Sequence, residues 1–195
     1  MYVNWRALVV LVVLAVGGWY AYDTFWAGGE KRAKMSTADL LAKYESSSAM
    51  ERELAHAELK GRAEKSGTLD AGALRAWLGK KTQAPETYKV AAEMLGRIQD
   101  RKSVDVFLKD LQDGSPAIRF GAARYFQHAP ARRAFDPLVK KLDPNEDPDV
   151  RKQCVDSLES LAAKTNTGVR YKAEPTKWRE WWDALSKGEK NKIPE

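Results

Sequence analysis

Three side chains in this sequence belong to types that carry out metal or nucleophilic chemistry: His56, His128 and Cys154. His56 has no second His or Cys three or four positions away, so one helix face does not present two metal ligands. His128 ends a predicted helix, where a positive charge suits the helix dipole. Cys154 stands beside Val155 and Leu158 on a predicted buried face, where a thiol behaves as a small hydrophobic group.

Known catalytic motifs are missing as well. The sequence contains neither a phosphate-binding G-x-x-x-x-G-K-[ST] loop nor a G-x-S-x-G nucleophile turn. With two histidines and one cysteine in the whole chain, material for a metal site is scarce. The sequence therefore predicts a protein that is not an enzyme, with no cofactor, no metal and no small-molecule substrate.

A cluster of tryptophans near the C-terminus is the first candidate for binding. Trp178, Trp181 and Trp182 are spaced i, i+3, i+4, which places them on one face of a short helix. Two interpretations stay open. The indoles cover the exposed end of a helical array, or they form an aromatic patch that binds a partner.

Basic residues are the second candidate. Four adjacent pairs recur near predicted helix ends: Lys80-Lys81, Arg101-Lys102, Arg132-Arg133 and Lys140-Lys141. They are either solvated turn residues or a basic edge that binds anionic lipid headgroups or the phosphates of nucleic acid. The 33 basic residues are largely balanced by 27 acidic residues, which leaves a net charge of only +6. The acidic loop DPNEDPD also interrupts one edge. Both features disfavour binding of nucleic acid.

The elements that position these residues are helices that repeat. The central one begins with Ser115 as the predicted cap and Pro116 at its first position, and it carries Ala122-Ala123. Segments starting at Pro85 and Pro148 repeat this pattern about 31 residues before and after it, which is the period of an α-solenoid built from helix pairs. Small residues between the apolar positions predict close contact between neighbouring helices. The predicted fold class is all-α.

These residues resemble HEAT repeats, in particular the short bacterial kind. Asp113 and Arg119 match the repeat's Asp and Arg, and the resemblance implies that the pair bridges adjacent turns. Arg151 repeats Arg119, but Asn145 replaces the Asp of that unit, so an incomplete ladder is expected. The segment 167–185, with its W-x-x-W-W helix, resembles the closing segment of such domains. The resemblance covers 85–185 well and 36–81 loosely, and it implies fold rather than activity.

Polar caps predict further helices before the repeats. Ser36 caps one helix, Ser48 begins a second through a capping box, and Asp70 caps a third. The predicted organisation is an anchor at 1–27, a juxtamembrane linker at 28–35, a HEAT-like repeat domain at 36–187 and a loose charged tail at 188–195. Residues 27–29 are expected to be a flexible exit from the anchor.

The N-terminal segment has the composition of a membrane span. Between Arg6 and Asp23 no residue is charged, and the stretch from Trp5 to Trp26 spans roughly 22 residues, or about 33 Å of helix. The residues assigned to this anchor are Trp5, Leu8, Leu11, Leu14, Gly17, Gly18, Trp19, Tyr22 and Trp26. Aromatic residues flank it as interfacial belts. A cleaved signal peptide is the competing interpretation, but a single basic residue precedes the apolar run and bulky aromatics crowd the cleavage region.

Orientation follows only weakly from the flanking charges. Lys31, Arg32 and Lys34 follow the span and Arg6 precedes it, which favours a cytoplasmic repeat domain over a periplasmic one. We therefore expect a single-pass cell-membrane protein whose HEAT-like solenoid serves as a non-catalytic scaffold, an accessory subunit of a larger integral-membrane complex. The alternative is a membrane-tethered binder of nucleic acid or anionic lipid.

Overall fold

The computed structural model describes residues 28–65, 67–80, 83–165 and 167–195. In these residues the regular secondary structure is helical, and no strand forms. The predicted anchor at 1–27 lies outside them, as do Ser66, the expected end of a helix, and Lys81. None of the helices in the described ranges combines the length and apolar composition needed to cross a membrane.

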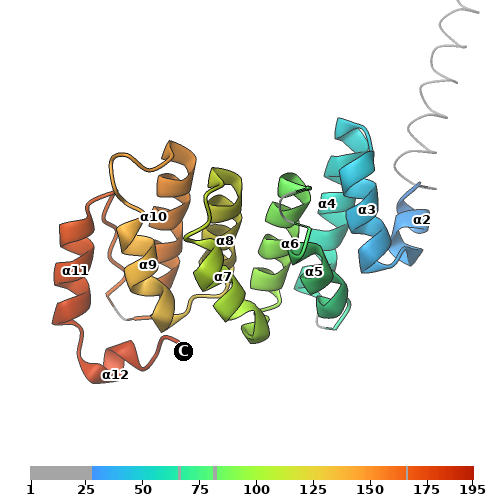
Figure 1. Cartoon of the computed structure of the whole chain (residues 1–195). Coiled ribbons are helices and arrows are strands. Elements are labelled where there is room, and N and C mark those ends of the chain that lie inside the picture. Colours follow the sequence, from blue (N-terminus) through green and yellow to red (C-terminus); the bar gives the residue numbers. More distant parts are fainter. Residues whose placement is uncertain (1–27, 66, 81–82, 166) are drawn as a thin grey trace, which may run out of the picture.

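The helices stand side by side in a row (Figure 1). Their order is α2 (Gly28–Lys34), α3 (Thr37–Ser46), α4 (Ala49–Glu64), α5 (Ala71–Leu78), α6 (Pro85–Arg97), η2 (Arg101–Ser103), α7 (Val104–Asp110), α8 (Pro116–His128), η3 (Arg132–Ala134), α9 (Phe135–Lys140), α10 (Pro148–Ala162), α11 (Pro175–Ala184) and α12 (Lys187–Lys190).

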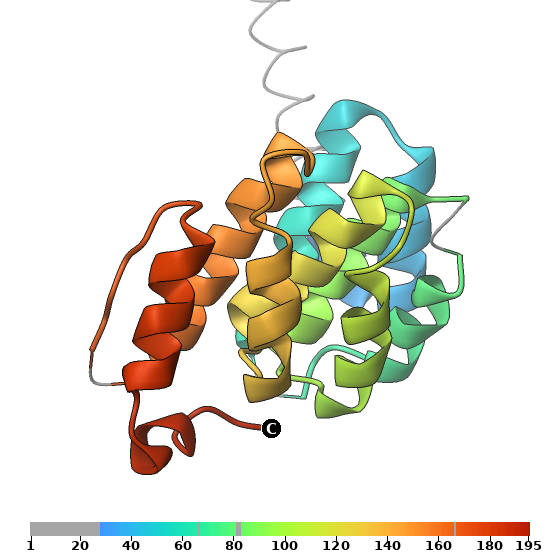
Figure 2. The same ribbon diagram turned by 60° about the vertical axis from the view of Figure 1, so that its left-hand side comes forward.

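Three helix pairs make up the centre of the row. The short helices α5, α7 and α9 each contact the long helix that follows them, and α8 lies between α6 and α10 (Figure 2). Each long helix begins with a proline at its first turn, namely Pro85, Pro116 and Pro148. Proline is tolerated there because the first helical N–H groups have no partner inside the helix. The all-helical repeat predicted from the sequence is confirmed for this region.

Small residues allow the long helices to approach one another. Ala91, Ala92, Ala122 and Ala123 are fully buried, as their spacing predicts. A Cβ atom on Gly121 would lie 2.6 Å from Cε1 of Tyr88. The neighbouring helix therefore occupies the space that a side chain at Gly121 would need.

Aromatic side chains of α6, α7 and α8 form part of the core. Phe107 stacks on Tyr125 with ring centroids 4.1 Å apart, and Phe126 meets Tyr125 edge-on at 5.1 Å. The buried hydroxyl of Tyr88 donates to Asp110 at 2.8 Å, and that of Tyr125 donates to the Asp100 carbonyl at 2.8 Å. Large rings supply apolar burial while each hydroxyl keeps a hydrogen-bond partner.

The helices before the repeats begin at the predicted caps. Ser36 and Asp39 form a reciprocal capping box at α3, Ser48 accepts from the Glu51 amide at α4, and Asp70 accepts from two amides at α5. The expected flexible linker is different: Gly28–Lys34 form the helix α2. This segment is therefore helical, although its two adjacent glycines predict a flexible backbone.

One arginine of α4 holds α2 in place. The Arg62 guanidinium donates to the carbonyls of Met35 at 2.7 Å, Arg32 at 2.7 Å and Ala33 at 3.0 Å, while its Nε donates to Glu58 at 2.8 Å. Carbonyls at a helix C-terminus lack partners inside the helix and carry partial negative charge, so a guanidinium satisfies both needs.

The C-terminal residues also differ from the expected loose tail. After α12 the chain turns back beneath α9 (Figures 1 and 2), and the Arg132 amide donates to the Pro194 carbonyl at 2.7 Å. Arg132 Nη1 donates to Asn191 at 2.9 Å, and its guanidinium also pairs with Glu195. Ile193 is 1% exposed. The prediction of a loose tail is wrong because one apolar residue and one arginine fix it to the last repeat.

Candidate functional site

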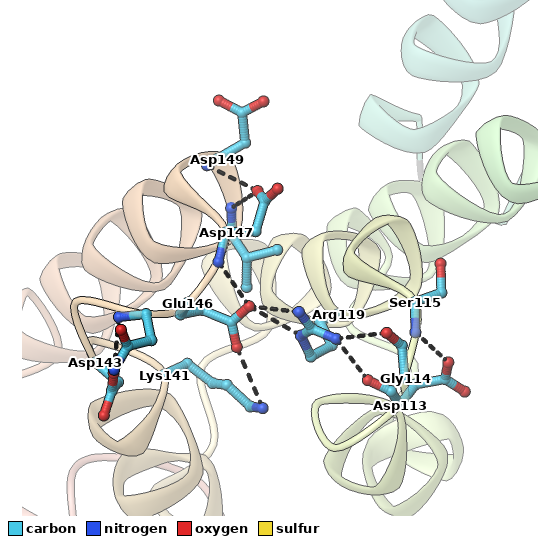
Figure 3. A network of polar contacts seen from close by, with 11 residues as sticks. Asp113, Gly114, Ser115, Arg119, Lys141, Asp143, Glu146, Asp147 and Asp149 are labelled. Carbon is cyan, nitrogen blue, oxygen red and sulfur yellow. Dashed lines mark hydrogen bonds and ion pairs between the residues drawn. The ribbon is translucent and has the colours of Figure 1, made fainter.

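Arg119 forms a polar bridge between successive repeats (Figure 3). Its Nη1 donates to the carbonyls of Asp113 at 2.8 Å and Gly114 at 2.9 Å, and its Nε donates to Glu146 Oε1 at 3.1 Å. Lys141 adds an ion pair to Glu146 at 3.3 Å. The expected incomplete ladder is thus closed by Glu146, the residue directly after Asn145.

The turn before α8 has a different cap from the expected one. The Ser115 side chain makes no capping hydrogen bond. Instead the Asp113 carboxylate accepts from the Ser115 amide at 2.9 Å (Figure 3). Arg151 repeats part of the Arg119 pattern, because its Nη1 donates to the Pro144 carbonyl at 3.0 Å. These residues stabilise the turns and the stacking of repeats, and we assign them a structural role.

The tryptophans lie at the end of the row. Trp178 is fully buried and Trp181 is 6% exposed, while Trp182 stacks on Phe135 of α9 with ring centroids 4.1 Å apart. The indole of Trp181 donates to Thr167 at 2.9 Å. This placement favours the interpretation in which the indoles cover the last repeat, since little of Trp178 or Trp181 is left for a partner.

Several of the paired basic residues already have partners within the chain. Arg101 donates to the Pro130 carbonyl at 2.9 Å, Arg133 pairs with Asp105 at 2.8 Å, and Arg132 and Lys141 have the contacts given above. Lys140 is exposed. A guanidinium or ammonium that is engaged in the fold contributes less to binding an external anion, so the predicted basic edge is weakened.

A charged cluster that the sequence analysis did not identify is centred on Glu93 of α6. The Glu93 carboxylate, 2% exposed, accepts from three side chains on three helices: His56 Nε2 of α4 at 3.3 Å, Arg97 Nε of α6 at 2.8 Å and Arg124 Nη2 of α8 at 2.7 Å. Burial raises the pKa of Glu93, but the hydrogen bonds from His56 and Arg97 and the charge of Arg124 lower it to about 2. Glu93 is therefore ionised at neutral pH.

His128 responds to the same cluster. Burial and the positive charge of Arg97, assisted by Arg124 and Lys60, lower the pKa of His128 to about 4, although Glu93 opposes the shift. The imidazole is neutral at pH 7, so the expected cation at the end of α8 is wrong. Burial is the largest cause of this shift, because it disfavours the charged form of the imidazole.

A groove leads to this cluster. Two adjoining cavities of about 450 and 270 Å³ share Tyr44 and Glu86 in their walls. The first continues between α3, α4 and the start of α6, where Arg52 lines it. The second is bounded by α4, α6 and α8, and its lining residues are Tyr44, His56, Glu86, Lys89, Val90, Glu93, Phe120 and Arg124. We call these two adjoining cavities the junction groove.

Local sequence signals explain why the cluster escapes prediction. Glu93 and Arg97 are an i, i+4 pair, which is the usual spacing of a solvated helix ion pair. Nothing near Glu93 predicts its burial, because His56 and Arg124 lie far from it in sequence. The fold brings them together by placing α4 and α8 on either side of α6.

The charged side chains around Glu93 can form ion pairs and hydrogen bonds. Within the described residues, no group of three or more His, Cys, Asp or Glu could hold a metal ion. Cys154 is fully buried, and burial raises the pKa of its thiol to about 12. A neutral buried thiol is a poor nucleophile.

One family model matches part of the chain. Residues 73–159 match the family model described as HEAT repeats. No curated protein matches the chain. The match begins within α5 and ends within α10, so it covers the three helix pairs that contain Glu93, Arg119 and Arg124. This segment of the chain is a HEAT-like helical repeat of the kind that mediates protein–protein contacts.

Proposed function

We propose that this chain is a non-catalytic scaffold, tethered to the cell membrane by residues 1–27, that acts as an accessory subunit of a larger integral-membrane protein complex. The anchor rests on the uncharged run between Arg6 and Asp23 and its flanking aromatics. The scaffold role rests on the HEAT-like repeat, because each helix pair of such an array contacts mainly its neighbours and leaves long surfaces for partners.

The contact of Arg62 with the end of α2 is the observation that carries the proposal furthest. It ties the first described helix to α4 by three guanidinium–carbonyl hydrogen bonds. A tether that precedes this helix would hold the solenoid near the bilayer. Such a tether raises the effective concentration of the scaffold near membrane partners.

For the side of the membrane, the basic residues after the span give a small preference. Lys31, Arg32 and Lys34 favour a cytoplasmic solenoid under the positive-inside rule. The intramolecular contacts of Arg101, Arg132, Arg133 and Lys141 reduce the support for the alternative, binding of nucleic acid or anionic lipid by the basic edge.

The proposal is tested by extracting the full chain from native membranes in mild detergent and cross-linking it in low and high salt. We expect a stoichiometric integral-membrane partner whose cross-links to both the span and the solenoid persist in high salt. A chain lacking residues 1–27 serves as the control and should leave the membrane fraction. Recovery of the full chain alone, or with nucleic acid or lipid that salt removes, would reject the scaffold.

A further inference from the structure

Residues 186–195 form a self-contained element, which we call the C-terminal strap. Ser186 and Glu189 close a capping box at its start. The backbone N–H groups of 190–193 also donate to carbonyls inside the strap. The strap follows directly on Leu185, whose extended backbone ends α11. It is therefore a short folded segment that one extended residue joins to the last helix of the row.

A single residue of the last repeat holds the strap by polar contacts. Within the described residues, every hydrogen bond and ion pair between the strap and the rest of the chain goes to Arg132. Its N–H donates to the Pro194 carbonyl at 2.7 Å, and its guanidinium donates to Asn191 at 2.9 Å and pairs with Glu195. Because Arg132 begins η3, its N–H has no acceptor inside that helix, and the strap satisfies it.

An apolar contact completes the attachment. Ile193 is 1% exposed and belongs to the same buried apolar cluster as Phe135. Lys190 Nζ lies 5.4 Å from the centroid of the Trp182 ring, which stacks on Phe135. We call Arg132 and the buried position that Ile193 fills the strap site. This site accommodates an apolar side chain two positions before a carboxylate.

The strap is held less firmly than the helices of the repeats. Asn191, Lys192 and Glu195 are exposed, and the ion pair of Glu195 with Arg132 leaves 67% and 29% of the two side chains accessible to water. Such a pair contributes little to stability. One buried apolar side chain and the contacts of one arginine must therefore offset the conformational entropy that the whole strap loses. A segment with so few buried contacts opens more readily than the core.

We propose that the strap site is a peptide-binding site, which the chain's own strap closes until a segment of a partner protein displaces it. The partner segment carries an apolar residue two positions before an acidic one, as the strap does at Ile193 and Glu195. Its apolar side chain takes the place of Ile193, and its carboxylate pairs with Arg132. The occupant is selected by the contacts that the strap already makes. This assignment rests on the proposed scaffold function and gives the chemistry of one partner contact.

The first experiment measures whether a free peptide can replace the strap. The probe is a fluorescent peptide with the sequence of 186–195, added in detergent to the full chain and to its Ile193→Ala variant, whose own strap is released. We expect the peptide to bind the variant about tenfold more tightly, because the attached strap of the unchanged chain competes at a high effective concentration. Equal affinities for the two chains, or binding to neither, would overturn the proposal.

Changed peptides test which side chains the site recognises. A peptide with Ile193→Ala should bind the variant chain at least about tenfold more weakly, since the buried apolar contact is lost. A peptide with Glu195→Gln should bind about threefold more weakly, because the ion pair that it loses is partly exposed. A peptide of the same composition in scrambled order should bind more weakly than either. If the scrambled peptide binds as the probe does, the site has no specificity for this pattern and the proposal fails.

Two neighbouring arginines locate the contact. In the Ile193→Ala chain, Arg132→Gln should weaken binding of the probe at least about fivefold, because the guanidinium that pairs with Glu195 is lost. Arg133→Gln is the matched control: it removes the same charge one residue away, from a side chain that is 54% exposed and pairs with Asp105 of α7. The control should bind the probe as its parent does. Equal losses would indicate a general charge effect and contradict the assignment.

Amide hydrogen exchange guards against a folding defect in Arg132→Gln, because it uses a chain in which Arg132 is unaltered. The probe should slow exchange of the Arg132 N–H in the Ile193→Ala chain about tenfold, since the Pro194 carbonyl of the peptide accepts from it. Protection elsewhere without protection of Arg132 would place the peptide at another site. Dimers of the unchanged chain that the probe dissociates would also overturn the proposal, because the occupant would then be the strap of a second copy.

Failure of the strap site remains distinct from failure of the scaffold. If the full chain with Arg132→Gln keeps its membrane partner although the probe no longer binds, the scaffold stands and the strap site does not contact that partner. If no membrane partner is recovered while the probe still binds at Arg132, the strap site stands and the accessory role fails.

Discussion

Arg119 of α8 donates from Nε to Glu146 Oε1 at 3.1 Å, joining the turn before one long helix to the turn before the next. The same guanidinium holds two carbonyls of its own turn. Glu146 is 8% exposed, and desolvation of the carboxylate is offset by the hydrogen bonds from Arg119, the Asp147 amide and Lys141, which together lower its pKa. A single side chain therefore connects the turns of two successive repeats.

Removing this bridge should loosen the array. We expect Arg119→Ala to lower the free energy of unfolding by about 2–3 kcal/mol, because Glu146 would stay largely buried with only Lys141 as its charged partner. Arg151→Ala is the control, since Arg151 Nη1 contacts a carbonyl of its own turn and it should cost about 1 kcal/mol or less. Thermal unfolding of the full chain followed by circular dichroism compares the two. Equal losses of unfolding free energy in the two variants would show that the contact between Arg119 and Glu146 adds nothing to stability.

The close approach of α6 and α8 makes one glycine difficult to replace. A Cβ on Gly96 would lie 2.7 Å from the Tyr125 carbonyl oxygen, which belongs to backbone and cannot move independently. We expect Gly96→Ala to destabilise the fold by about 1–3 kcal/mol. Gly61 lies inside α4 with nothing within 4 Å of its Cβ position, so Gly61→Ala should stabilise by up to about 1 kcal/mol. Chemical denaturation should show a lower unfolding free energy for Gly96→Ala and a higher one for Gly61→Ala. A loss of stability in Gly61→Ala would contradict the conclusion that its Cβ position is unobstructed.

His128 should make stability depend on mildly acidic pH. Its pKa is about 4 in the folded chain against an ordinary value of 6.5, so the folded state resists protonation while the unfolded state accepts it. Stability is therefore complete above pH 6.5 and falls as the pH drops from 6.5 towards 4. We expect His128→Gln to flatten the unfolding free energy over this window. In the variant Glu93→Gln the unfolding free energy should still fall between pH 6.5 and pH 4. If His128→Gln leaves that fall unchanged, other titratable groups cause the pH dependence.

The C-terminal segment should detach when its one buried side chain is shortened. Ile193 is 1% exposed, and Ile193→Ala removes the apolar contact that holds 191–195 beneath α9. We expect faster amide hydrogen exchange in 187–195, with little change in α6 or α8. Lys192→Ala, at an exposed position, serves as the control and should leave the exchange unchanged. Slow exchange in Ile193→Ala would mean that Arg132 alone fixes the tail.

Local sequence determined most of the helices from Thr37 onwards. Proline at the first turn, serine or aspartate at a cap, and pairs of alanine at a constant period act within a few residues of one another, so Pro85, Ser36 and Ala122 predict their own surroundings. Their recurrence also predicted the helical repeat. The anchor at 1–27 likewise follows from the uncharged run alone, and it stays a prediction.

Only the tertiary structure decided which charges meet. Glu146 closes the bridge that the sequence leaves open at Asn145, Ile193 is buried, and Glu93 joins His56 and Arg124 from helices distant in sequence. The physical reason is one of range. Helix formation and capping depend on contacts within a turn, whereas these pairings depend on how far each helix pair is rotated and displaced against the next. That displacement is set by the packing of all the helices together, and no short stretch of sequence encodes it.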